Sequence, residues 1–271
     1  MKQIKVNNDS GLKNRVCIVI PVYNHAMTLL QVVIDACKLG MPVIVVDDGS
    51  TEPLPDGLDD IGGVTLLRHK KNLGKGAALL TGMAYAARTC NWAITMDADG
   101  QHLSEDVINL MHPIQNKHKL CESLVNCANF HRHWEKNSND SPDSFRPIVV
   151  GKRVGMKGAA VPWTSRFGRH FSNFWVRISG GPKVGDSQSG FRIYPLPETL
   201  DLDVRSRRYQ YEVEVLVKAY RNHIPVIEAP VNVVYDEHGK RISHFQPVTD
   251  FLRNFATFSR LIAERMFFKS H

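Results

Sequence analysis

The chain has 271 residues, of which 43% are hydrophobic and 23% charged, as in a globular protein of one large or two small domains. Its formal net charge of +7 would suit a nucleic acid, an anionic membrane or a phosphorylated substrate. The basic residues are dispersed and no nucleic-acid motif accompanies them, so a nucleic-acid partner is not expected. No apolar run approaches the length of a membrane span, and the polar residues 1–14 lack the apolar core of a signal peptide.

The cysteines do not resemble a disulfide framework, because their number is odd and their spacing irregular: Cys17, Cys37, Cys90, Cys121 and Cys127. A reducing, cytosolic compartment is the simpler interpretation.

Apolar runs in the first hundred residues predict strands that alternate with helices. The runs cover residues 16–22, 42–46, 64–67 and 92–96. Apolar residues at helical spacing predict helices over 29–37, ended by Gly40 and Pro42, and from Lys75 to Ala86. This alternation predicts βαβ units and a mostly parallel sheet in an α/β protein.

Residues 112–147 interrupt this pattern with a stretch rich in Asn, His, Lys and Ser. We expect a solvated insertion there. Its cysteines and histidines match no standard zinc spacing: Cys121, Cys127, His131 and His133.

Regular structure is predicted again after the insertion. We expect a strand at 147–151, helices over 161–178 and 211–220, strand segments within 224–235, and an amphipathic helix over 248–268. The last helix either packs onto the domain or rests on a membrane surface. We expect one domain spanning 1–271.

Polar clusters follow three of the predicted strands, at 23–24, 47–50 and 97–99. Parallel strands place such clusters on one edge of the sheet, where open α/β sheets bind ligands. Asp97 and Asp99 are two residues apart and would share one side of an extended segment. Mg²⁺ commonly binds to one or two carboxylates together with substrate phosphates. The stretch from Met96 to His102 therefore predicts a metal–diphosphate site, although Asp99-Gly100 alone would also suit a simple turn.

Other stretches leave two interpretations open. Asn72 to Gly76 precedes a helix but does not match a P-loop, and no dinucleotide-binding fingerprint follows the first strand, so an ATPase or a dehydrogenase is not expected. Residues 186–192 suit a ligand-shaping loop or a capped turn. Glu212 and Glu214 open a helix, where its dipole favours carboxylates. The arginines of 161–178 are either solvated or contact a phosphate or lipid headgroup.

In this order the motifs IPVYNH, VVDDGST, NLGKGAAL, MDADGQH, DSQSGFR and YEVEVLVKA resemble those of family 2 glycosyltransferases of GT-A fold, most closely the dolichyl- and polyprenyl-phosphate hexosyltransferases. The resemblance covers roughly residues 16–255 apart from the insertion. It implies a three-layer, Rossmann-like α/β fold. It also implies inverting, metal-dependent transfer of a hexose from a GDP- or UDP-sugar.

The resemblance also implies roles for particular residues. Around the base and ribose it places Pro21, Tyr23, Asp47 and Asp48, with Asn24 and Val46 also in the donor site. Around the diphosphate it places Asp97, Ala98, Asp99 and Gln101, of which Asp97, Asp99 and Gln101 would hold Mg²⁺ or Mn²⁺. Arg153 would meet a phosphate, and Ser243-His244 would close over the donor. For the acceptor we expect Arg166, Arg169 and Ser189.

The acceptor decides whether a base is needed. A lipid phosphate is already anionic, whereas a hydroxyl acceptor requires a base, for which the candidates are Asp186, Glu212 and Glu214. We expect a lipid-phosphate or other lipid acceptor and a cytoplasmic protein in peripheral contact with an anionic membrane. The alternatives are a soluble or glycan hydroxyl acceptor, a sugar-1-phosphate nucleotidyltransferase, and a non-catalytic nucleotide-sugar-binding module. The nucleotidyltransferase would want a glycine-rich loop after the first strand, and residues 21–24 are not such a loop.

Overall fold

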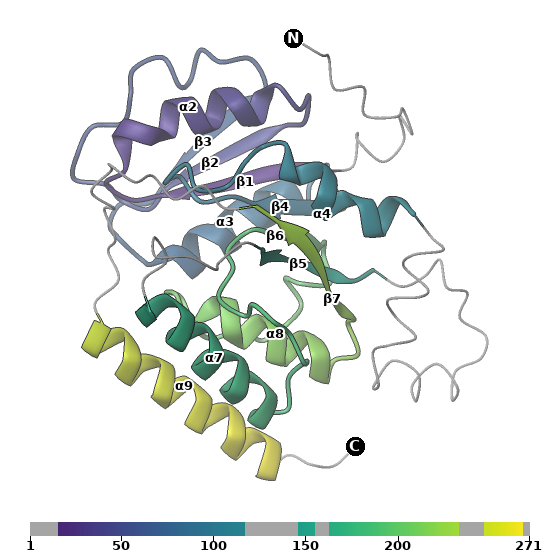
Figure 1. Ribbon diagram of the computed structural model, residues 1–271. Helices are drawn as coiled ribbons and strands as arrows, with labels where there is room; N and C mark the ends of the chain where they lie inside the picture. Colours follow the sequence, from purple (N-terminus) through teal and green to yellow (C-terminus); the bar gives the residue numbers. More distant parts are fainter. Residues whose placement is uncertain (1–15, 117–145, 155–162, 233–246, 268–271) are drawn as a thin grey trace.

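The computed structural model describes residues 16–116, 146–154, 163–232 and 247–267 (Figure 1). Its strands form one sheet in the order β3-β2-β1-β4-β6-β5-β7. The strands are β1 (Val16–Val22), β2 (Val43–Asp47), β3 (Val64–Arg68), β4 (Trp92–Thr95), β5 (Ile148–Arg153), β6 (Arg192–Pro195) and β7 (Val226–Val231). The helices are α2 (Ala26–Cys37), α3 (Lys75–Ala86), α4 (Asp106–Gln115), α7 (Trp163–Ile178), α8 (Tyr211–Arg221) and α9 (Pro247–Phe267). Only β6 runs against the other strands, so the predicted mostly parallel sheet is confirmed.

The central strand β1 shows why its sequence is an unbroken apolar run. Ile18 and Ile20 belong to the core cluster that includes α2 and α4, whereas Cys17 and Val19 belong to the cluster that includes α3 and α8. Successive side chains of a strand point to opposite faces, so a strand covered on both faces must be apolar at every position. The sheet is therefore the middle of three layers.

Helices α7 and α9 extend the layer that contains α8. Val176 of α7, Val217 of α8 and Phe258 of α9 belong to one small apolar cluster. Figure 1 shows α9 as the outermost helix of this layer, on the far side of α7 and α8 from the sheet.

Three expectations need correction. Helix α4 continues to Gln115, so the irregular stretch does not begin at His112; residues 117–145, with the four residues considered for zinc, lie outside the described part. The antiparallel strand β6 was not predicted. Cys17 is joined to Cys90 in a disulfide, which corrects the expectation of reduced cysteines for this pair.

The sheet topology fixes where a ligand can bind. The carboxyl ends of the six parallel strands and the start of β6 lie at one edge. The strand order reverses between β1 and β4, and crevices at such switch points are the usual ligand sites of open α/β sheets. In the described ranges, no helix combines the length and the apolar character needed to cross a bilayer.

Candidate functional site

The turn after β4 lies at this switch point. Ala98 is buried, and its carbonyl oxygen accepts a hydrogen bond of 2.5 Å from the hydroxyl of Thr28 on α2. The backbone N–H of Gln101 donates to Oδ1 of Asp99 at 3.1 Å, and Gly100 has φ +73°, which glycine adopts without strain. Asp99-Gly100 is thus a turn, as the simpler interpretation proposed. The turn also holds the half-buried Asp97 at the edge of the sheet.

Asp97 forms a three-membered charge cluster with Lys75 and Glu212. The Lys75 ammonium lies 2.7 Å from Oδ1 of Asp97 and 2.6 Å from Oε1 of Glu212. Burial opposes ionisation of both Lys75 and Asp97. The attraction between them outweighs it, raising the pKa of Lys75 and, with His102 and Arg153, lowering the pKa of Asp97 to about 2. Lys75 and Glu212 are 137 positions apart in the chain, and no local sequence pattern predicts their pairing.

Gly76 explains how Lys75 reaches Glu212. A Cβ at Gly76 would lie 2.5 Å from Cβ of Tyr211, so only glycine permits this close approach of α3 to α8. The backbone N–H of Ala77 also donates to the carbonyl of Arg207 at 2.9 Å, just before α8. The NLGKG stretch therefore serves helix packing. The backbone N–H groups of Leu73 and Gly74 donate to the Asp48 carboxylate and so are directed at the protein itself.

Gly190 keeps the space between the three charged groups free of side-chain atoms. A Cβ there would lie 2.7 Å from Nζ of Lys75, 2.9 Å from Oδ2 of Asp97 and 3.0 Å from Oε1 of Glu212. The carbonyl of Gly190 accepts a hydrogen bond of 2.6 Å from the Thr95 hydroxyl, which fixes its position against β4.

The residues of the turn suit a hard divalent cation. Asp97 and Asp99 offer carboxylate oxygens, the ligands that Mg²⁺ and Mn²⁺ prefer. Within the described ranges no three His, Cys, Asp or Glu side chains gather into a metal site of their own. A cation at Asp97 and Asp99 would therefore need further oxygens, such as those of a bound diphosphate.

The two aspartates after β2 both have partners within the protein. Oδ1 of Asp47 accepts a hydrogen bond from the Ser50 backbone at 2.9 Å, and its Oδ2 lies 2.7 Å from Nε of Arg68. Besides its two loop N–H groups, Asp48 lies 2.7 Å from the His69 ring. Both carboxylates are buried, and Asp48 in particular shapes the loop before α3.

The remaining residues of the predicted donor site lie at the ends of β1 and β2. Pro21 pairs with Val46 in register. The Val46 side chain belongs to the core beneath the sheet, so any donor contact there has to come from its backbone. Tyr23 is the first residue after β1. Asn24, at φ +49°, accepts a hydrogen bond of 2.9 Å from the Thr51 backbone and so ties the two strand ends together.

Asp186 forms a buried ion pair with Arg153. Nε and Nη2 of Arg153 donate to the two Asp186 oxygens at 2.6 and 2.8 Å, and Nη1 of Arg169 lies 4.0 Å away. Both oxygens of this buried carboxylate are therefore occupied by one guanidinium. The geometry favours Asp186 as the group that orients Arg153.

Arg192 was not singled out from the sequence, yet it braces the loop before it. Its side chain is fully buried and donates to the carbonyls of Ser187, Ser189 and Glu212 at 2.7–2.8 Å. Ser189, a predicted acceptor residue, is itself buried. An arginine opening a short, otherwise apolar strand was the one available signal for this role.

Helix α7 holds the same loop from the other side. Nδ2 of Asn173 donates to the Gly185 carbonyl at 2.8 Å, and the hydroxyls of Ser172 and Ser187 lie 2.8 Å apart. Glu228 of β7 accepts from the backbone of Gly185 at 2.7 Å. The loop is therefore fixed by α7, by β7 and, through Arg192, by β6.

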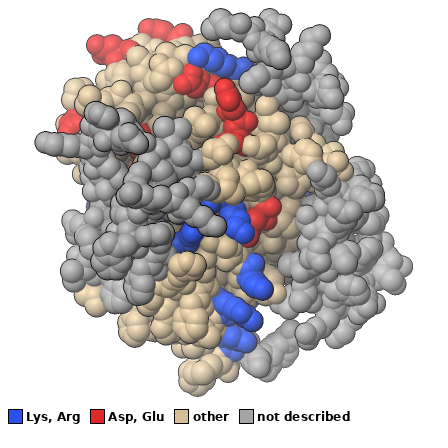
Figure 2. Space-filling view, viewed as in Figure 1, with Lys and Arg blue, Asp and Glu red and all other residues tan. Residues whose placement is uncertain are grey.

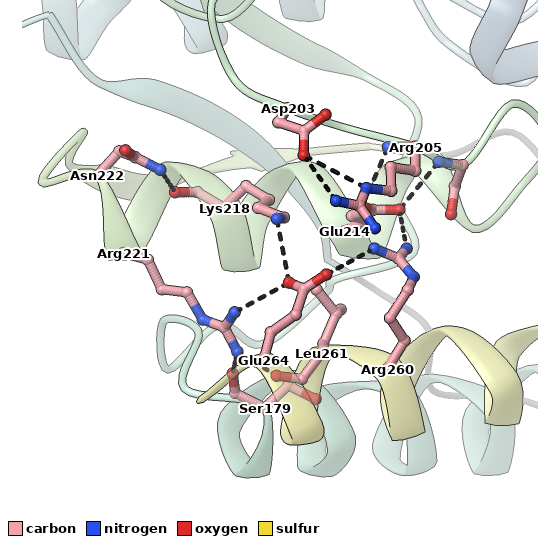
Figure 3. A network of polar contacts seen from close by, with 11 residues as sticks. Ser179, Asp203, Arg205, Glu214, Lys218, Arg221, Asn222, Arg260, Leu261 and Glu264 are labelled. Carbon is pink, nitrogen blue, oxygen red and sulfur yellow. Dashed lines mark hydrogen bonds and ion pairs between the residues drawn. The ribbon is translucent and has the colours of Figure 1, made fainter. Parts of the chain in front are cut away.

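Glu214 does not lie with the cluster around Lys75. Two residues on a helix are about 200° apart, so Glu212 and Glu214 face opposite sides of α8. Glu214 is fully buried and accepts hydrogen bonds from Arg260 of α9 at 2.7 Å and from the backbone of Ser206 at 3.0 Å (Figure 3). The structure corrects its candidacy as a base. Of the other predicted residues, the side chain of Arg166 and all of Ser243 and His244 lie outside the described part.

Comparisons with known proteins agree on one family. The model of the family described as "Glycosyl transferase family 2" matches residues 17–177, more than half of the chain. A Methanococcus voltae protein named UDP-N-acetylglucosamine–dolichyl-phosphate N-acetylglucosaminyltransferase is 26% identical over 92% of this chain and 95% of its own. The polyprenol monophosphomannose synthase of Mycolicibacterium smegmatis is 26% identical over 83% of this chain and 79% of its own.

A solved structure supports the fold. Glucosyl-3-phosphoglycerate synthase of Mycobacterium tuberculosis, in complex with Mn²⁺, UDP-glucose and phosphoglyceric acid, matches with a TM-score of 0.63 at 16% identity, over 92% of this chain and 80% of its own. The predicted GT-A fold is thus confirmed. The chain belongs to glycosyl transferase family 2 and is a glycosyltransferase.

Proposed function

We propose that the protein transfers a hexose from a GDP- or UDP-sugar to a polyprenyl phosphate, with inversion at the anomeric carbon and with a divalent cation. The two named relatives, from Methanococcus voltae and Mycolicibacterium smegmatis, carry dolichyl phosphate and polyprenol monophosphomannose in their names, which supports this acceptor class. The family match favours this reaction over the nucleotidyltransferase and non-catalytic alternatives.

The observation that carries the proposal is the state of the three candidate bases. Asp186 is paired with Arg153, Glu212 with Lys75, and Glu214 with Arg260. A hydroxyl acceptor needs a group that can take its proton, and a carboxylate held by a cation is poorly suited to that. A phosphate acceptor is already ionised and needs no such group.

The positive charges at the edge of the sheet suit two phosphorylated substrates. Asp186 holds the Arg153 guanidinium in a fixed orientation, and a fixed guanidinium is well arranged to meet phosphate oxygens. Arg169 lies beside the same carboxylate. Lys75 contributes a further positive charge next to Asp97, where we place the diphosphate of the donor.

In the proposed reaction an oxygen of the acceptor phosphate attacks the anomeric carbon, and the bond from that carbon to the nucleoside diphosphate breaks. Asp97 and Asp99, with Gln101, would hold Mg²⁺ or Mn²⁺, whose positive charge would stabilise the departing diphosphate. Arg153 and Lys75 act on the same developing negative charge. From the family motifs we place the base and ribose of the donor near Tyr23, Asp47 and Asp48. The lipid acceptor would reach the protein from the cytoplasmic face of an anionic membrane.

Transfer of radiolabelled sugar tests this function. A panel of GDP- and UDP-sugars is incubated with a short, water-soluble prenyl phosphate and Mn²⁺, with and without excess EDTA. We expect one donor to give a labelled prenyl phosphate, and chelation to abolish the product. Thermal shifts with the same nucleotides form a second readout. If no nucleotide raises the melting temperature in the presence of Mn²⁺, the donor site is misassigned.

A further inference from the structure

Helix α9 exposes large apolar side chains in addition to those that it buries. Its outward positions, three and four residues apart, form a stripe without a charged side chain: Leu252, Phe255, Ala256, Ser259, Ala263 and Met266. Leu252, Phe255 and Met266 are 60%, 52% and 64% exposed. We call this stripe the apolar face of α9. A helix that merely covers a domain turns such residues inward, so the apolar face calls for a partner.

Two charged residues of α9, Arg260 and Glu264, instead face the protein. Glu264 lies 3.0 Å from Lys218 and 3.4 Å from Arg221 of α8, and Arg260 lies 2.7 Å from Glu214 (Figure 3). Phe258 and Leu261 are buried between these ion pairs. Both anchors hold α9 in a fixed rotation, and that rotation is what keeps the apolar face outside.

Basic side chains border this apolar face. Helices α7 and α9 together contain six arginines but only two acidic residues, Asp250 and Glu264. Of these two, Glu264 is engaged with α8. Arg177, Arg253 and Arg265 are exposed, and Arg265 also donates to the Ile178 carbonyl at 2.7 Å. Figure 2 shows lysine and arginine side chains in a row down the middle of the lower half of the molecule, beside the lower-left part where Figure 1 places α9.

Helix α7 connects this region to the candidate site. Through Ser172 and Asn173 it holds the loop that carries Asp186, and it exposes Phe174 by 56%. Trp175 contacts Phe174 edge-on at 5.5 Å between ring centroids and stacks on Phe258 of α9 at 6.2 Å. Helix α7 therefore contacts both the loop of the candidate site and α9.

We propose that the apolar face of α9 docks the protein on the surface of an anionic lipid bilayer. Helices with an apolar face flanked by basic residues lie in the membrane interface, where the apolar side chains enter the acyl boundary and the arginines meet anionic headgroups. A second copy of the chain is a poorer partner. A twofold contact through this face would bring the basic borders of both copies together. This inference rests on the proposed lipid acceptor and names the surface that brings the enzyme to it.

Flotation with lipid vesicles tests the docking surface. The full chain is mixed at low salt with vesicles of phosphatidylcholine alone or of phosphatidylcholine with phosphatidylglycerol. We expect the wild type to float with the anionic vesicles and less with the neutral ones. The double variant Leu252→Ser/Phe255→Ser should lower the partition coefficient by about tenfold or more, because two large apolar side chains no longer enter the lipid.

Met27→Ser is the matched control. Met27 is 92% exposed on α2, which Figure 1 places at the opposite end of the molecule from α9. We expect this variant to float like the wild type and both variants to keep the wild-type melting temperature. Equal flotation of the double variant and the wild type would overturn the proposal. A second combination of results would also overturn it: the wild type is a dimer in analytical ultracentrifugation and does not bind vesicles, and the double variant is a monomer.

Activity separates this inference from the proposed function. With a short, water-soluble prenyl phosphate, Leu252→Ser/Phe255→Ser should transfer sugar at the wild-type rate. With a long polyprenyl phosphate in anionic vesicles it should be about tenfold slower. A wild type that floats but glycosylates no prenyl phosphate would refute the proposed acceptor and leave the docking surface standing. Full activity of the double variant on vesicles would refute the surface alone.

Discussion

The two faces of α8 carry charge clusters built from the same residue types in different settings. On one face Glu212 meets Lys75 and Asp97 at the edge of the sheet, around the space that Gly190 leaves open. On the other face Glu214 meets Arg260 in an interface closed by α9. Neither carboxylate can be assigned a role from residue type alone. We propose that the first cluster meets the donor, whereas the second holds two helices together.

The contrast predicts that substitutions on the first face affect activity and those on the second affect stability. Asp97→Asn should lower kcat/KM for the donor by about a thousandfold, because the proposed cation loses a carboxylate ligand beside the diphosphate. Its melting temperature should fall by a few degrees, because the neutral amide no longer attracts the Lys75 ammonium, but the variant should stay folded at the assay temperature. Asp35→Asn, on exposed α2, is the control and should be fully active. If Asp97→Asn lost its activity because it unfolded, the proposed difference between the two faces of α8 would not hold.

Lys75→Met should give the next largest effect, a loss of about a hundredfold in kcat/KM. The substitution keeps a flexible side chain of similar length but removes the positive charge between Asp97 and Glu212. Lys38→Met, at an exposed ion pair of α2, is the matched control and should leave the rate unchanged. Near wild-type activity of Lys75→Met would show that the cluster has no part in donor binding.

Glu214→Gln should destabilise the protein by about 2 kcal/mol, because it removes the buried charge that pairs with Arg260 and leaves that guanidinium with Glu264 alone. Urea unfolding measures this loss. The rate with a short prenyl phosphate should change little, since Glu214 faces away from Lys75. A large fall in kcat for the folded variant would place Glu214 in the catalytic machinery after all.

The pH dependence of stability should show the same interface with a smaller effect. Burial alone would raise the pKa of Glu214 and of Glu264, but hydrogen bonds and charges from Arg260 and Lys218 outweigh it and lower both values. A lowered carboxyl pKa stabilises the fold above the ordinary value of about 4.3, and this contribution is lost as the pH falls through the folded value. We expect the melting temperature of the wild type to fall more steeply below about pH 4.5 than that of Glu214→Gln. If the melting temperatures of the two proteins fell equally with pH, the ion pair of Glu214 would not contribute to this pH dependence.

The sequence predicted well where local pattern decides the structure. Strands such as β1 are apolar throughout because both of their faces are covered, and parallel strands necessarily bring Asp47 and Asp97 to one edge. The family motifs added the candidate roles. These features need only residue type and short-range order.

Contacts between residues far apart in the chain could not be predicted from local sequence pattern. The sequence could not pair Lys75 with Glu212, nor Arg153 with Asp186, because those contacts depend on how α8 and the loop before β6 pack. It also treated Glu212 and Glu214 as equivalents, although their spacing on a helix already places them on different faces. The apolar face of α9 could not be predicted from the sequence, because it depends on which side of the helix meets α8.

Comparison of two acceptors tests the central claim most directly. A polyprenyl phosphate and the polyprenol of the same chain length are offered to the wild type with the preferred sugar nucleotide and Mn²⁺, and the labelled lipid product is measured. The ion pairs at Asp186 and Glu212 predict transfer to the phosphate and none above background to the alcohol, since no candidate carboxylate is placed to take the hydroxyl proton. Transfer to the polyprenol at a rate equal to or above that of the phosphate would contradict the account.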